Sequence, residues 1–318
     1  MSHGRIIPLA AALAMAWTSL AAGQVTPGEL DQLNQAIGQR VESTVILATA
    51  NSLTTGAYTW NLDNTDVDIT NLTWEFDIGD KHPIGQTGLQ YMWSSEGGAG
   101  FANYRDQFVT GPLVANEERF QSYPIGESIG PRIFFTDDIS VLTEAGLIYG
   151  YTVNEFDAVT IPGQIVVDDS LVNWHAQTLT FTPSIQLQYE RTFFGVLHVR
   201  ARSNFAYYVT GPIERSTDAW SFRSSSEVWD NGIDLDYNTG IRLLGCEMHL
   251  GSSISRTDLF DGIETALDTS HYYNIAGRLM FDTSGKLWIL SQLGLGTSYT
   301  WGEGFRGYDF GVVLGISF

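Results

Sequence analysis

Several things are scarce in this chain of 318 residues, and each scarcity excludes a class of protein. Cysteine occurs once, at Cys246, so no intrachain disulfide can form. Lys and Arg total 16 against 36 Asp and Glu, and the net charge of −20 argues against a nucleic-acid partner, because phosphate binding needs a basic surface. Charged residues make up only 16%, against roughly a quarter in average globular proteins. After residue 23, no apolar run is long enough for a transmembrane helix.

Glycine, aromatic residues and alternating patterns are abundant instead. There are 33 glycines, and aromatic residues reach 13%. Residues Arg306 to Phe318 place a large apolar side chain at every second position, with small or polar residues mostly between them. Successive side chains of a strand point to opposite faces, so one face of this segment is wholly apolar. In a transmembrane β-barrel such a face meets lipid, and aromatic residues mark the membrane edge.

The same period of two continues from about residue 50 to the end of the chain. Many of these runs exceed the roughly five or six residues usual in soluble sheets. The alternation predicts strands near 50–61, 69–79, 84–95, 127–136, 139–156, 174–192, 195–210, 232–244, 245–257, 270–281, 286–300 and 306–318.

The predicted connections alternate between short and long. The short ones are 80–83, 137–138, 193–194, 244–245 and 282–285. The others are mostly longer: 62–68, 96–126, 157–173, 211–231, 258–269 and 301–305. Short periplasmic turns and longer external loops are typical of outer-membrane barrels. We therefore predict an all-β fold, a transmembrane antiparallel β-barrel of about 12 strands, over residues 49–318.

The first 23 residues have the pattern of a secretory signal peptide. Arg5 supplies the positive charge, Ile6 to Leu20 is apolar, and small residues follow at Ala21 to Gly23. A membrane anchor is the alternative, but the apolar run is shorter than the roughly 20 residues that span a bilayer. We interpret residues 1–23 as a signal peptide.

Residues 24–48 are predicted to hold a single N-terminal helix. Thr26, Pro27 and Glu29 are typical of a helix start. The apolar residues recur at spacings of three and four: Leu30, Leu33, Ile37, Val41 and Val45. Its charged residues keep this helix away from lipid. It either packs on a soluble sheet or lies in or near a barrel lumen, and the periodicity does not separate the two.

Together these features resemble the translocator β-barrel domain of bacterial autotransporters, the type V secretion system. The resemblance covers roughly residues 27–318 and includes the C-terminal segment Gly311 to Phe318. It implies a barrel in the bacterial outer membrane with the helix running through its pore. It also implies that Phe318 is the C-terminal signal read by the outer-membrane assembly machinery. Autotransporters carry a passenger after the signal peptide, whereas here only a few residues separate Gly23 from the helix, so we expect the solitary form without a passenger.

The expected activity is that of a non-enzymatic outer-membrane barrel, a narrow pore. An outer-membrane barrel hydrolase, phospholipase- or omptin-like with a rim active site, is the alternative. The His residues beyond the signal peptide lie in no His-x-Ser-Asn-Gly stretch, and the H-E-x-x-H motif is absent. We therefore predict no catalytic residues, no cofactor and no metal site. A soluble secreted β-sandwich carrying a helix is a third possibility.

Charged residues on the inward faces of the strands are the remaining functional candidates. They include Glu190, Arg200, Arg202, Asp234, Arg242 and Arg278. Arg200 and Arg202 face strand neighbours that can supply Glu190 and Asp234. Ion pairs of this kind either hold a barrel rigid or set the charge selectivity of a pore.

The expected partners follow from the membrane location. They are outer-membrane lipid, lipopolysaccharide bridged to the acidic loops by divalent cations, and the outer-membrane assembly machinery. We expect a monomer and no nucleic-acid partner.

Overall fold

The structure is a computed structural model that describes residues 27–49, 56–62, 65–109, 115–157, 173–216, 221–283, 290–303 and 305–316. The predicted signal peptide and Phe318 lie outside the described residues.

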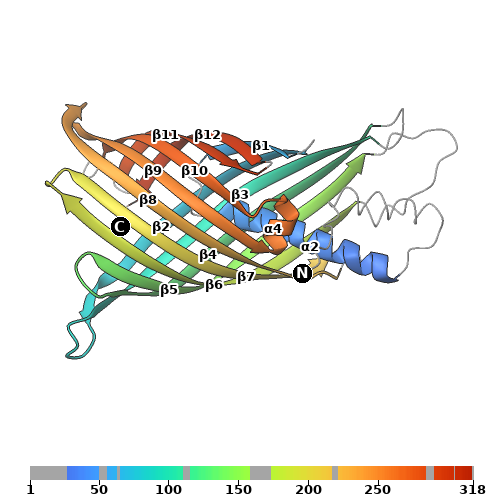
Figure 1. Ribbon diagram of the computed structural model, residues 1–318, viewed down its shortest axis with the longest axis horizontal. Coiled ribbons are helices and arrows are strands. Elements are labelled where there is room, and N and C mark those ends of the chain that lie inside the picture. The colour runs from blue at the N-terminus through green and yellow to red at the C-terminus, as the bar shows by residue number, and fades with distance from the viewer. Residues whose placement is uncertain are drawn as a thin grey trace.

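The described strands form one antiparallel sheet that closes on itself, because β1 pairs with β12 as well as with β2 (Figure 1). The predicted all-β antiparallel barrel is therefore confirmed. The strands are β1 (Gly56–Leu62), β2 (Thr65–Pro83), β3 (Gln90–Val109), β4 (Ala115–Phe134), β5 (Ile139–Asp157), β6 (Trp174–Phe193), β7 (Leu197–Arg215), β8 (Ser224–Leu243), β9 (Cys246–Asp261), β10 (His271–Asp282), β11 (Leu290–Gly302) and β12 (Phe305–Ile316).

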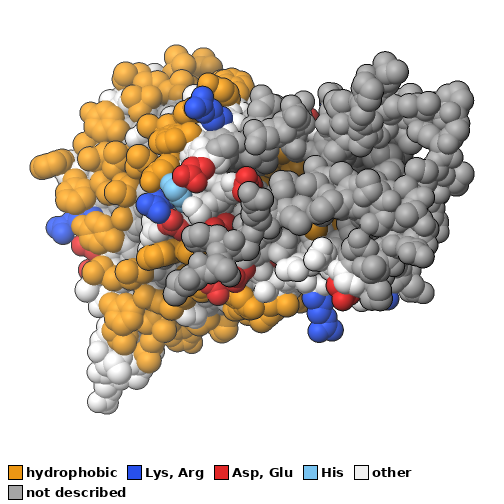
Figure 2. Space-filling view, turned by 45° about the vertical axis from the view of Figure 1, so that its right-hand side comes forward, with side chains coloured by type: hydrophobic (Ala, Val, Ile, Leu, Met, Phe, Trp, Pro, Cys, Tyr) orange, Lys and Arg blue, Asp and Glu red, His pale blue; other side chains and the backbone are white. Residues whose placement is uncertain are grey.

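The alternation seen in the sequence separates the outer wall from the lumen. On β5, Leu142 and Ile148 point inward and are buried, whereas Leu147 and Tyr149 between and beyond them point outward. Leu147 is 53% exposed. Similar outward apolar residues on the other strands cover much of the outer wall (Figure 2). A large exposed apolar surface of this kind is what a lipid-facing wall requires.

The two ends of the barrel differ in their connections. At one end, here called the turn end, residues 84–89, 135–138, 194–196 and 244–245 link successive strands. The last two turns place Phe194-Gly195 and Leu244-Gly245 at positive φ, the backbone geometry that two-residue hairpin turns need to match strand twist. The opposite end, the loop end, carries the link between β9 and β10, which contains the short helix α4 (Gly262–Leu267).

Helix α2 (Pro27–Thr49) lies inside the barrel and reaches toward the loop end (Figure 1). It contacts α4 and the inner faces of several strands, including β2, β3, β4 and β8. Its second half, Ile37 to Ala48, is buried. Apolar residues from the helix, the strands and α4 form one cluster, which includes Val41, Leu47, Ile69, Phe120, Trp174 and Ile263. Among the described helices, none is both long and apolar enough to cross a membrane.

The segment 96–126, predicted as the longest connection, is instead mostly strand. β3 and β4 pair across it from Val109 and Ala115 down to the turn end, which leaves only 110–114 as the connection. The prediction was wrong because Ser94 to Gly100 has no apolar alternation to read. Gly98 and Gly100 face the end of α2, where only a glycine fits, so the signal of a strand is missing.

Other boundaries also moved toward longer strands. Leu62 pairs with Thr65, so the predicted loop 62–68 is a tight hairpin. Residues 80–83, predicted as a turn, belong to β2. β7 and β8 take residues from both ends of the predicted loop 211–231, and the predicted loop 258–269 holds α4. Where the strands are longer than predicted, mostly polar residues continue the strand pairing, and the alternation of apolar residues does not reveal such extensions.

Candidate functional site in the barrel lumen

Polar contacts hold α2 in the half of the lumen that lies near the loop end. Glu42 is fully buried and accepts hydrogen bonds from Ser224 Oγ at 2.7 Å and Ser226 Oγ at 2.5 Å. The Arg40 guanidinium lies 5.3 Å from the ring centre of Tyr104 and 5.0 Å from that of Phe120. A buried carboxylate and a buried guanidinium on a helix are thus met by hydroxyls and aromatic faces of the wall, which stabilises α2 in this position.

Glycines of β3 let the end of α2 approach the wall. A Cβ built on Gly98 would lie 2.8 Å from the carbonyl oxygen of Thr49, and one built on Gly100 would overlap the carbonyl oxygen of Ala48. Only residues without a side chain allow this backbone contact. The glycines of β3 therefore make room for the end of the helix.

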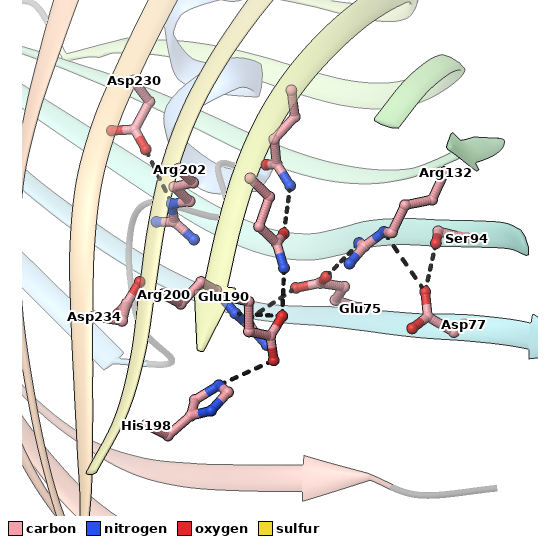
Figure 3. Close-up of polar contacts among 12 residues, drawn as sticks. Glu75, Asp77, Ser94, Arg132, Glu190, His198, Arg200, Arg202, Asp230 and Asp234 are labelled. Carbon is pink, nitrogen blue, oxygen red and sulfur yellow. Dashed lines mark hydrogen bonds and ion pairs between the residues drawn. The ribbon is translucent and has the colours of Figure 1, made fainter. Parts of the chain in front are cut away.

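Below the helix, toward the turn end, charged side chains from distant strands meet (Figure 3). Arg132 on β4 donates to Glu75 Oε1 on β2 at 2.8 Å, skipping β3 between them. Arg200 Nη1 on β7 lies 3.7 Å from Glu75 Oε2. Because β2 and β7 are not neighbours in the sheet, the Glu75–Arg200 contact crosses the lumen.

Glu190 on β6 joins this network from the turn end. Its carboxylate lies 3.7 Å from Arg200 Nε and 2.9 Å from His198 Nε2, and it accepts a hydrogen bond of 2.6 Å from Gln188. Figure 3 shows these side chains pointing toward one another across the space enclosed by the strands. The lumen is therefore narrowed by paired charges where the helix no longer fills it.

Two further ion pairs line the neighbouring wall. Arg202 Nε lies 3.4 Å from Asp230 Oδ2, and Arg278 Nη2 donates to Asp234 Oδ1 at 3.3 Å. Sequence reasoning offered Asp234 as an acid for the pair Arg200 and Arg202. The structure gives Asp234 a hydrogen bond from Arg278 on β10, since long side chains reach beyond the adjacent strand.

Arg242 was predicted to face the lumen, and this prediction was wrong. Arg242 pairs with Glu247 in the β8–β9 hairpin, and 70% of its side chain is exposed. A register shift between Asn238 and Arg242 interrupts the β8–β9 pairing. The Asn238 N–H donates to Val196 O at the β6–β7 turn, so the rest of the hairpin extends beyond that neighbouring turn. The alternation gave no signal of this shift.

Sequence reasoning missed several lumen residues that the structure brings together. Arg132 falls within a predicted strand, opposite in phase to Ile133, so the alternation could have identified it. Glu96 lay in a segment read as a loop, and Glu144 in a strand whose inward face was not searched for charges. The buried Glu42 had no sequence signal apart from its place in the helix, because its partners are about 180 residues away.

Cavities lined by described residues lie in the lumen below α2. One of about 120 Å³ lies at the C-terminal end of the helix, and one of about 390 Å³ lies closer to the turn end. Gln188 lines both cavities. No cluster of three or more His, Cys, Asp or Glu arranged to hold a metal ion occurs in the part of the chain that the structure describes.

The sequence matches a family model described as "Solitary outer membrane autotransporter beta-barrel domain" over residues 43–314. The chain belongs to this family. Such barrels reside in the bacterial outer membrane, so the apolar outer wall faces lipid. By the same architecture, the turn end faces the periplasm and the loop end faces the outside. No curated protein matches the sequence.

Solved autotransporter structures share the fold of this solitary barrel. The transport unit of the autotransporter AIDA-I from Escherichia coli is 10% identical, with a TM-score of 0.55, and the match covers 93% of this chain and all of that one. The beta domain of the Bordetella autotransporter BrkA is 12% identical, with a TM-score of 0.52 and coverage of 83% and 97%. Both comparisons support a translocator-type barrel architecture.

One arrangement of side chains in the solitary barrel resembles a hydrolase site in composition. Thr192 Oγ1 lies 3.2 Å from His198 Nδ1, and His198 Nε2 lies 2.9 Å from Glu190. Thr192 and His198 are directly opposite across the β6–β7 hairpin, so strand pairing alone accounts for their contact. The group lies at the periplasmic end, whereas the hydrolase alternative placed its site at the outer rim.

Proposed function

We propose that this barrel is a narrow, non-enzymatic outer-membrane pore whose conductance is limited by α2. The observation that carries the proposal is the burial of Ile37 to Ala48 inside the sheet, with Glu42 hydrogen-bonded to wall serines on β8. The helix occupies the outer part of the lumen, and the Glu75–Arg200 contact spans the part below it. The cavities on either side of this contact leave room for water and small ions.

Conductance in planar bilayers tests this proposal. We expect the full chain to conduct weakly, and a variant lacking residues 27–48 to conduct severalfold more, because the remaining wall then encloses an open lumen. Heat-modifiable gel mobility of both proteins checks that each barrel is folded. Equal conductance of the two folded proteins would show that α2 does not restrict the pore.

We also propose that the barrel is a monomer in contact with outer-membrane lipid and lipopolysaccharide. The pairing of β1 with β12 supports a monomer. It closes the sheet with strands of one chain, so no strand from a second chain is needed to cover an open edge. The exposed apolar outer wall supports direct lipid contact.

A further inference from the structure

The outer wall of β10 to β12 carries a row of aromatic side chains near the loop end. Tyr273 and Trp301 are directly opposite in the β10–β11 pairing, and their ring centres lie 5.5 Å apart with an interplanar angle of 21°. Trp301 also stacks on Tyr299, at 5.6 Å and 16°. Tyr299 in turn meets Tyr308, directly opposite on β12, at 4.9 Å. These rings from three neighbouring strands therefore form one continuous aromatic surface, here called the aromatic row.

The outward side chains of β12 change in character toward the loop end. Val312 and Phe310 are apolar and exposed, and Tyr308 follows with 73% of its surface exposed. Arg306 is the next outward residue and is also exposed. Because the loop end faces the outside, the order runs from apolar through aromatic to cationic toward the outer surface. A membrane lipid presents its acyl chains and its anionic headgroup in this same order.

Arg306 carries a charge that is available to an anion. It lies directly opposite Trp301 in the β11–β12 pairing. Within the described part of the chain, no carboxylate forms an ion pair with its guanidinium, and this includes the exposed Glu303 in the β11–β12 connection. Arg256 lies directly opposite Tyr273 on β9, but its guanidinium is held by Asp258. The cationic site beside the aromatic row is therefore Arg306.

Another part of the wall shows that aromatic residues near the membrane edge need not come with such a charge. There, Phe101, Tyr123 and Tyr151 form a comparable row on β3 to β5. Arg119 lies on the same strand as Tyr123, nearer the loop end, and its guanidinium is 3.8 Å from Glu155. The combination of an aromatic row with a guanidinium that has no acid partner thus distinguishes the wall of β10 to β12.

We propose that the aromatic row and Arg306 bind lipopolysaccharide through its lipid A, an acylated disaccharide that carries phosphates. The proposal rests on the proposed contact with lipopolysaccharide and gives that contact a place on the wall. Arg306 pairs with a lipid A phosphate, since a guanidinium matches phosphate geometry. A sugar ring packs its C–H groups on the electron-rich face of Tyr308. The acyl chains lie along Phe310 and Val312.

Native mass spectrometry of the full chain in detergent, titrated with diphosphorylated lipid A, tests the site. We expect the Kd of the first bound lipid A to be at least about tenfold weaker in Arg306→Ala, because a charge-assisted contact is lost. Arg119→Ala is the matched control and should bind as the wild type does, since Arg119 is a partly exposed arginine near the loop end that already has Glu155 as a partner. Equal affinity of wild type and Arg306→Ala would overturn this site and leave the general contact with lipopolysaccharide standing. Absence of binding to the wild type would contradict both.

The wild-type barrel alone keeps the proposal testable if Arg306→Ala does not fold. Two other lipids should bind severalfold more weakly than diphosphorylated lipid A: phosphate-free lipid A lacks the anion for Arg306, and phosphatidylglycerol lacks the sugar ring for Tyr308. Equal affinity for phosphate-free lipid A would overturn the role of the guanidinium. Equal affinity for phosphatidylglycerol would overturn the assignment to a glycolipid. Neither measurement depends on whether the barrel conducts.

Discussion

At the scale of single residues, Arg132 is the charge on which the lumen network most depends. Only 5% of its side chain is exposed, and its guanidinium reaches both Glu75 and Asp77 from across β3. A buried guanidinium is tolerated only where carboxylates compensate for its lost hydration. Removing it takes away the 2.8 Å hydrogen bond to Glu75 and leaves that carboxylate the longer contact with Arg200 at 3.7 Å.

Replacing Arg132 by Met should therefore destabilise the barrel by about 2 kcal/mol, less than for a fully dry ion pair because Glu75 keeps contact with lumen water. Urea unfolding in detergent micelles measures the change. Arg119→Met is the control, since the exposed Arg119–Glu155 pair should contribute less than about 1 kcal/mol. A destabilisation no larger than that of the control would mean that the network contributes nothing to stability.

At the scale of elements, the contact between α2 and β3 determines where the helix ends in the lumen. The carbonyl groups of Ala48 and Thr49 lie against Gly100 and Gly98, so the strand accommodates the helix by omitting side chains. The remaining helix contacts are hydrogen bonds and apolar packing farther up the lumen. The close backbone contact is thus a steric determinant of how deep α2 sits.

Gly100→Ala should displace the end of α2, because the added methyl group overlaps the Ala48 carbonyl oxygen. We expect a loss of about 1–3 kcal/mol in unfolding free energy, the usual cost of overpacking. Gly277→Ala on β10 is the matched control, since a Cβ there meets nothing within 4 Å. Equal stability of the two variants by urea unfolding would contradict this account of the helix position.

At the scale of the whole molecule, closure of the sheet makes the membrane location possible. A strand edge in lipid would leave unpaired N–H and C=O groups, and the β1–β12 pairing removes that edge at Ala57 and Tyr58. The closing strand β12 belongs to the C-terminal segment 306–318 whose alternation was the first sign of a barrel. The role of the final residue, Phe318, as an assembly signal stays a prediction.

Deleting Phe318 should lower the amount of folded barrel in the outer membrane severalfold, if the residue is the signal that the assembly machinery reads. Membrane fractionation with heat-modifiable gel mobility measures the folded fraction in cells. Refolding of the same variant in detergent is the control and should proceed as in the full chain. A normal amount of folded variant in the outer membrane would show that Phe318 is not part of the assembly signal.

The sequence by itself determined the fold class, because alternation with a period of two reports which strand face meets lipid and needs no knowledge of neighbours. Leu147 and its outward counterparts carry that signal on β2 to β12. The tertiary structure alone decided which charges meet, since Glu75 and Arg200 lie on strands that are far apart in the sheet. It also decided that Gly98 and Gly100 are strand residues, because their requirement is the close approach of a helix that comes about 50 residues earlier in the chain.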